Sequence, residues 1–177
     1  MSIKKSESDE FEVAVTNVFS FLEHDFNFSY IGSKTIQEDP RDSYVVAKYR
    51  RNNSRINIAW NPFAMSIIVL IRLNNDELGR REKYIYFEPF VEFSSNGSLT
   101  PVVPQIYPGM SIGKIEKAME QRKKCFDAGI VSVVEVLAKR LREYYSTVES
   151  ASADTINQYH KWYLSKGENN NITLGIT

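Results

Sequence analysis

The sequence predicts an α+β fold in which a four-stranded antiparallel meander packs against an N-terminal helix and long C-terminal helices. Between residues 44 and 93, short runs of apolar, aromatic and β-branched residues alternate with polar turn signals, as in consecutive strands. Before and after this stretch, apolar residues recur with the helical period of about 3.6 residues. A chain of 177 residues fits one domain, with flexible tails expected at 1–8 and 168–177.

The first helix is predicted over residues 9–24. Asp9 and Glu12 have the spacing of a capping box, in which each side chain accepts a hydrogen bond from a free backbone N–H. Behind them, apolar residues fall on one helical face. Residues 26–31 are apolar-rich and fit a short strand or a packed loop, and residues 32–43 have the polar composition of turns.

The four strands of the meander are predicted at residues 44–50, 55–60, 66–73 and 84–93. In the second of them, Ile56, Ile58 and Trp60 alternate with smaller or polar residues, which gives one buried face. The third is apolar at nearly every position, so we expect a helix to cover its second face as well. The fourth contains Pro89, which cannot donate a ladder hydrogen bond, and this favours an edge strand or a bulge.

Three helical segments follow a loop at residues 94–109 that is long enough to be functional. Ser111 can cap a helix that runs to about Phe126. The strongest apolar stripe begins after Asp127, and Gly129 either separates two helices or bends one, so the sequence leaves open whether 113–147 is one helix or two. A last helix is predicted over residues 154–164.

The sequence carries no specific catalytic signature. It lacks a Gly-rich phosphate loop, a His-Glu-x-x-His motif, a Gly-x-Ser-x-Gly motif and a Cys-x-x-Cys motif. His24 at a helix end, His160 between aromatic residues and the lone Cys125 each have an ordinary structural explanation. We therefore expect no enzyme, no cofactor and no metal site. The polar N-terminus and the lack of a long apolar segment favour a soluble cytoplasmic protein.

Charge is unevenly distributed although the net charge is zero. Residues 1–42 carry nine acidic and four basic side chains, and residues 43–90 carry eight basic and four acidic ones. The acidic candidates for partner binding are Glu10, Asp25, Glu38, Asp39 and Asp42. The basic alternative is the hairpin surface of Arg50, Arg51 and Arg55, with Tyr49, Tyr84 and Tyr86 near it, which would suit nucleic acid. Zero net charge makes nucleic acid the less favoured partner, and tyrosine and arginine are typical of protein interfaces.

The order of elements resembles that of small bacterial immunity proteins, including those of contact-dependent growth inhibition systems. The resemblance covers roughly residues 9–147: a helix ending in the run FLEHDFNF, the meander strands in YVVAKY, INIAW and IIVLIRL, and a long C-terminal helix. It implies a stoichiometric inhibitor of a cognate toxin, often a nuclease. Under this hypothesis the acidic residues would enter a basic toxin cleft, and the opposite polarity, with the arginine-rich hairpin as the interface, fits equally. An adaptor for a secreted effector is a third possibility.

Overall fold

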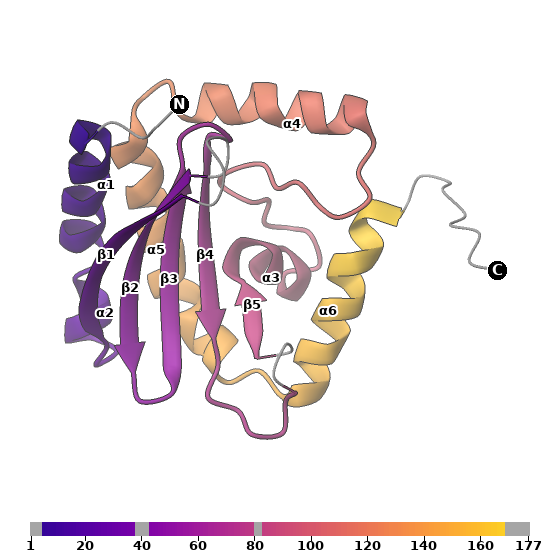
Figure 1. Ribbon diagram of the computed structural model, residues 1–177. Coiled ribbons are helices and arrows are strands. Elements are labelled where there is room, and N and C mark those ends of the chain that lie inside the picture. The colour runs from indigo at the N-terminus through magenta and orange to yellow at the C-terminus, as the bar shows by residue number, and fades with distance from the viewer. Residues whose placement is uncertain (1–4, 38–42, 80–82, 169–177) are drawn as a thin grey trace.

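The computed structural model describes residues 5–37, 43–79 and 83–168, and it has the predicted α+β architecture (Figure 1). An antiparallel sheet has five strands in the order β1-β2-β3-β4-β5, each next to its neighbour in sequence. The strands are β1 (Ser29–Gln37), β2 (Ser43–Arg51), β3 (Ser54–Asn61), β4 (Ser66–Arg72) and β5 (Tyr84–Tyr86). The meander is therefore confirmed, with one strand more than the sequence predicted.

The helices precede and follow the sheet in the chain. They are α1 (Lys5–Val18), α2 (Phe21–His24), α3 (Phe87–Ser94), α4 (Ile112–Cys125), α5 (Ile130–Glu149) and α6 (Ala153–Glu168). Residues 113–147 thus belong to two helices, and Gly129, with φ +89° and ψ 164°, lies between them. This backbone region is essentially accessible to glycine alone, which explains why the helical pattern breaks there.

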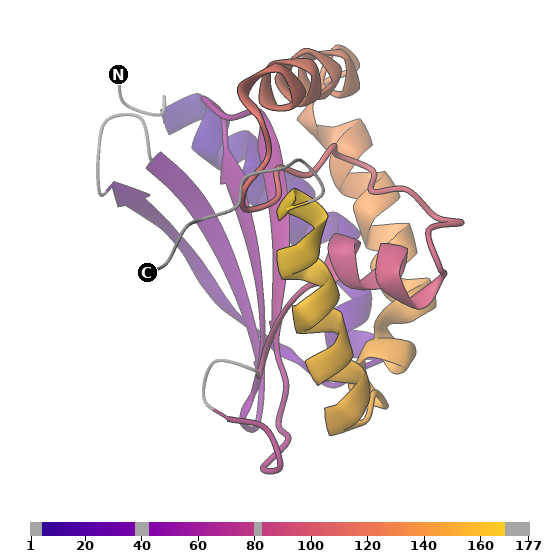
Figure 2. The ribbon, with the colours of Figure 1, turned by 90° about the vertical axis from the view of Figure 1, so that its right-hand side faces the viewer.

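The described helices lie on one side of the sheet, at its β5 edge or, in the case of α4, beyond the ends of the strands, and the other face has no described helix over it (Figures 1 and 2). Figure 1 looks onto this uncovered face, with α5 behind the strands. The prediction that a helix covers the second face of β4 is wrong: Ile67, Val69 and Ile71 are buried, whereas Ile68 and Leu70 on the opposite face are only half-buried.

The core fills the space between the inner sheet face and the helices. Ile56, Ile58 and Trp60 are buried as predicted, and the ring of Trp60 stacks on Phe11 of α1 with centroids 5.7 Å apart. The apolar stripe of α5 is also buried. Because one helix layer and one sheet layer share this core, the outer sheet face adds little to it.

Four further expectations from the sequence differ from the structure. The residues 32–43, expected to be turns, contain most of β1, which pairs with β2 through a bulge between Tyr30 and Gly32. The strand expected over 84–93 ends at Tyr86, and Pro89 lies in the first turn of α3, where a missing N–H costs no helical hydrogen bond. The helix expected over 9–24 is two helices. Residues 5–8, expected to belong to a tail, are helical.

Candidate partner-binding surface

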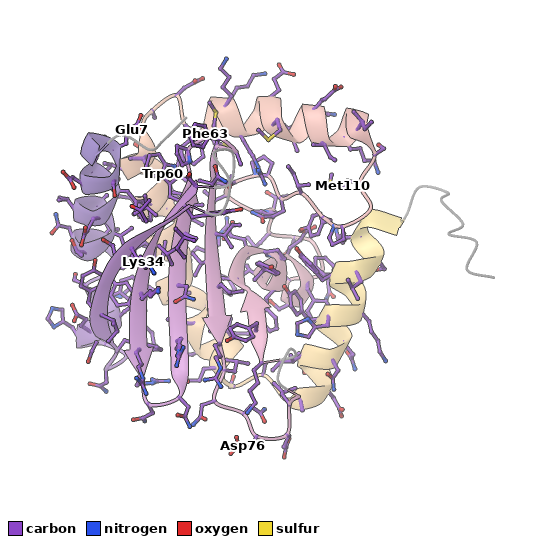
Figure 3. All side chains as sticks on the ribbon, viewed as in Figure 1. Glu7, Lys34, Trp60, Phe63, Asp76 and Met110 are labelled. Atoms are coloured by element: carbon purple, nitrogen blue, oxygen red, sulfur yellow. The ribbon has the colours of Figure 1, made fainter. Side chains whose placement is uncertain are left out.

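The uncovered sheet face is built by the residues that alternate with the core positions along each strand. We call it the open face. Its described outward positions carry cationic, aromatic and a few aliphatic side chains, and no acidic residue is among them. They include Ile31, Lys34, Ile36, Tyr44, Val46, Lys48, Arg50, Arg55, Asn57, Ala59, Ile68, Leu70, Arg72, Tyr84 and Tyr86. Figure 3 views the molecule from this side and labels Lys34 on β1.

Strand register places three arginines in one line across the open face. Arg50 of β2 is the direct partner of Arg55 of β3, which is the partner of Arg72 of β4, and Arg72 is in turn paired with Tyr84 of β5. We call Arg50, Arg55 and Arg72 the arginine row. Like charges directly opposite one another on a sheet are destabilising, so this arrangement costs folding stability.

No described carboxylate neutralises the arginine row by an ion pair. Arg50 Nε donates instead to the carbonyl of Asn52 at 3.0 Å, and Arg72 Nη1 donates to the carbonyl of Asn53 at 2.6 Å. Both acceptors belong to the β2–β3 hairpin loop. These bonds orient the two outer guanidinium groups and leave their charges uncompensated by the residues that the structure describes.

A groove of about 270 Å³ adjoins the arginine row on the open face. Its lining includes Ile31, Lys48 and Tyr84 in addition to Arg50 and Arg55. The β1 bulge turns Ile31 outward, so this side chain is 60% exposed. The groove therefore combines a cationic wall with apolar and aromatic surface, which is the composition of binding hot spots.

Arg51, which the sequence grouped with Arg50 and Arg55, lies on the other side of the sheet. Its guanidinium packs 4.8 Å from the Phe28 ring centroid, donates to the carbonyl of Phe26 at 3.0 Å and forms an ion pair with Glu149 of α5. It also donates to the Tyr145 hydroxyl at 3.2 Å. Tyr49 is buried as well, so neither residue belongs to the open face.

The acidic candidates do not form one site among the described residues. Glu10 is exposed on α1 and, with Asp9, Val13 and Val131, lines a shallow groove between α1 and α5. Asp25 follows α2, and its Oδ2 forms an ion pair with Nη2 of Arg142 on α5 at a distance of 2.7 Å. The other three, Glu38, Asp39 and Asp42, lie outside the described residues. The acidic interface has no geometric support from the described part of the chain.

The three side chains that the sequence offered for chemistry, His24, His160 and Cys125, have surroundings that fit a role in the fold. His24 is exposed at the end of α2, the His160 ring lies 5.1 Å from that of Tyr159, and Cys125 Sγ is 3.6 Å from the carbonyl of Val102. Within the described ranges, no group of three or more histidine, cysteine or acidic side chains is arranged to hold a metal ion.

Glu88 is a buried carboxylate, with 3% of its surface exposed. It accepts a hydrogen bond from the Val102 backbone N–H and forms an ion pair with Arg140 at 3.3 Å, and Arg140 also donates to the carbonyl of Thr100 at 2.7 Å. Burial raises the pKa of Glu88 above the usual carboxyl range, although the Val102 and Arg140 contacts act in the opposite direction. These contacts fasten the loop after α3 to α5, which is a structural role.

Sequence reasoning missed Arg72 as a member of the basic surface. The signal was present, because Arg72 follows the buried Ile71 and therefore points outward in a strand. What the sequence lacked was the register that aligns Arg72 with Arg55.

Comparisons of the chain with protein-family models, with curated proteins and with solved structures find no match. No helix in the described ranges is both long and apolar enough to cross a membrane.

Proposed function

We propose that this protein is an immunity-type inhibitor that binds a cognate toxin protein in the cytoplasm, one to one, and that the open face is its binding surface. The observation that carries the proposal is the arginine row beside an aromatic and apolar groove on a sheet face that the fold leaves uncovered. Arginine and tyrosine dominate the energetics of protein interfaces. The sequence resemblance to immunity proteins supplies the class of partner.

The described residues favour a basic interface over an acidic one. The open face gathers five cationic side chains from four strands, whereas the acidic candidates Glu10 and Asp25 lie on separate helices, with Asp25 engaged by Arg142. A toxin that meets the open face would therefore present an acidic surface. Charge of this kind contributes to the association rate and to the choice of partner.

The β2–β3 hairpin is held against α5, which favours binding of the partner by a surface that is already formed in the free protein. Arg51 joins the inner side of β2 to α5 through Glu149 and Tyr145, directly behind Arg50. A surface that needs no ordering on binding loses less conformational entropy.

The test combines capture with growth rescue. The purified chain is immobilised, lysate of its source cell is passed over it at moderate salt, and the retained protein is identified by mass spectrometry. The gene of that protein is then expressed in a test bacterium with and without the present chain. We expect arrested growth without it and normal growth with it. A retained protein that is harmless alone, or toxic regardless of the present chain, would overturn the proposal.

Nucleic-acid binding is the second candidate, because the arginine row and Tyr84 also suit a phosphate backbone and a stacked base. It predicts affinity for bulk RNA or single-stranded DNA that falls steeply as salt is added. An immunity protein has no reason to show this behaviour. A filter-binding titration at two salt concentrations separates the two functions.

A further inference from the structure

We propose that the arginine row is a carboxylate-binding site that receives an acidic segment of the partner protein. This inference rests on the proposed function for the identity of the partner, and it adds the chemistry of the epitope. It explains why the fold tolerates Arg50, Arg55 and Arg72 directly opposite one another on three adjacent strands. Carboxylates inserted between neighbouring guanidinium groups convert a repulsive row into a row of charge-assisted hydrogen bonds.

The spacing of the row fits acidic side chains on one segment. Adjacent strands are about 4.8 Å apart, so the three arginine Cα positions extend over about 10 Å across the sheet. Carboxylates two residues apart in an extended segment are separated by about 7 Å, and those at i and i+4 of a helix by about 6 Å. Either segment, crossing the strands along the row, places two carboxylates against three guanidinium groups.

The groove beside the row supplies the rest of the recognition surface. Ile31 and Tyr84, which is 37% exposed, present apolar contact area, and Asn57 lies between the cationic positions Lys48 and Arg55 as a neutral hydrogen-bonding group. A residue of the acidic segment with an aliphatic or aromatic side chain would fill this groove. The site is thus specific for acidic residues next to an apolar residue, and not for charge alone.

Carboxylates fit this face better than a nucleic-acid strand does. Stacking of successive bases needs several exposed aromatic rings. Of the two tyrosines on β5, Tyr86 already stacks on Tyr163 of α6, with centroids 5.3 Å apart and planes inclined by 18°. The aliphatic positions Ile31, Ile68 and Leu70 offer bases no polar readout, whereas they suit the apolar side chains of a protein partner.

The test uses the full chain and synthetic probes. The first probe is a short peptide of alternating glutamate and serine with one central leucine. The comparison probes are the same peptide with glutamine for glutamate, the same peptide with lysine for glutamate, and a single-stranded DNA oligonucleotide. Binding is followed by NMR through the arginine Nε–H resonances, which report millimolar affinities and identify the residue. The variants are Arg55→Gln and, as a matched control away from the open face, Arg142→Gln.

We expect the acidic peptide to shift the Nε–H resonances of Arg50, Arg55 and Arg72, and not that of Arg142. Arg55→Gln should weaken binding about fivefold, because one short-range charge interaction in a water-like dielectric is worth about 1 kcal/mol. The glutamine and lysine peptides should not bind. No shift with the acidic peptide, an unchanged affinity of Arg55→Gln, or tighter binding of the oligonucleotide than of the peptide would each overturn the inference.

Growth rescue distinguishes the failure of this inference from that of the proposed function. If the chain neutralises a toxin and Arg55→Gln neutralises it equally well at limiting expression, the carboxylate site is refuted while the proposed function stands. If the acidic peptide binds at the arginine row and no toxin is neutralised, the proposed function fails and the carboxylate site stands.

Discussion

Replacing Arg55 by glutamine should stabilise the free protein, because Arg55 is the middle member of the arginine row and opposes a like charge on each side. At a separation of about 6 Å in a water-like dielectric, each arginine pair costs about 0.7 kcal/mol without salt. With a Debye length of about 8 Å at physiological salt, the cost falls to about 0.3 kcal/mol per pair. Glutamine keeps the start of the aliphatic stem and removes both repulsions.

The expected gain in the free energy of unfolding is therefore about 0.6 kcal/mol at physiological salt, or an increase of about 2 °C in Tm for a domain of this size. Urea denaturation at low, physiological and high salt measures it. The gain should be largest at low salt and vanish at high salt. Arg142→Gln, which removes the ion pair with Asp25, should show no gain at any salt concentration. Destabilisation by Arg55→Gln, or a gain independent of salt, would refute the repulsion on which the carboxylate site depends.

Three further substitutions test the fold around the site. Because burial raises the pKa of Glu88, the native state holds the carboxyl proton more tightly than the unfolded chain does, and the stability of the wild-type protein falls as pH rises from about 4.3 through the raised pKa. Glu88→Gln should therefore be more stable than the wild type at neutral pH. Urea denaturation across pH should show this difference disappearing in acid. Arg51→Ala should lower the free energy of unfolding by about 2 kcal/mol, because it removes charge-assisted hydrogen bonds. Arg50→Ala should change it by less than about 0.5 kcal/mol. Equal effects of the two substitutions would contradict the assignment of these arginines to opposite faces. Gly129→Ala should cost about 1–3 kcal/mol from backbone strain alone, since an added Cβ meets no atom within 4 Å, while Gly113→Ala in α4 should be neutral or stabilising in the same thermal melt.

Two different patterns predicted strands correctly: side-chain alternation in β3, and in β4 a short apolar run that follows a turn signal. Ile56, Ile58 and Trp60 mark β3 clearly, and the β2–β3 hairpin follows from its two-asparagine loop. The part of β1 from Gly32 on was missed, because Gly32 and the adjacent bulge shift the alternation by one residue, which removes the periodic signal. The sequence predicts a strand over 84–93, although α3 begins at Phe87, because so short an apolar run does not let periodicity separate a strand from a buried helix.

Of the arginine row, the sequence predicted Arg50 and Arg55 but not Arg72. Arg50 and Arg51 are adjacent in the sequence and were predicted to share one basic surface, although the alternation of side chains along a strand assigns them to opposite faces. Arg72 could be joined to Arg50 and Arg55 only through two successive strand registers, and these depend on turn geometry and packing between distant residues. The acidic interface of Glu10 and Asp25 was inferred from local composition, which carries no information on whether two helices bring their charges together.

The division of the sheet into a buried and an open face has a consequence for how such a protein can diversify. Along β2 the even-numbered positions from Tyr44 to Arg50 face outward, and along β3 the odd-numbered positions from Arg55 to Ala59 do so, while their neighbours form the core. The inward residues of each strand therefore determine stability, and the outward residues that alternate with them determine what the face can bind, so each set can vary without the other. A combinatorial library restricted to the outward positions could change the chosen partner while the scaffold stays intact.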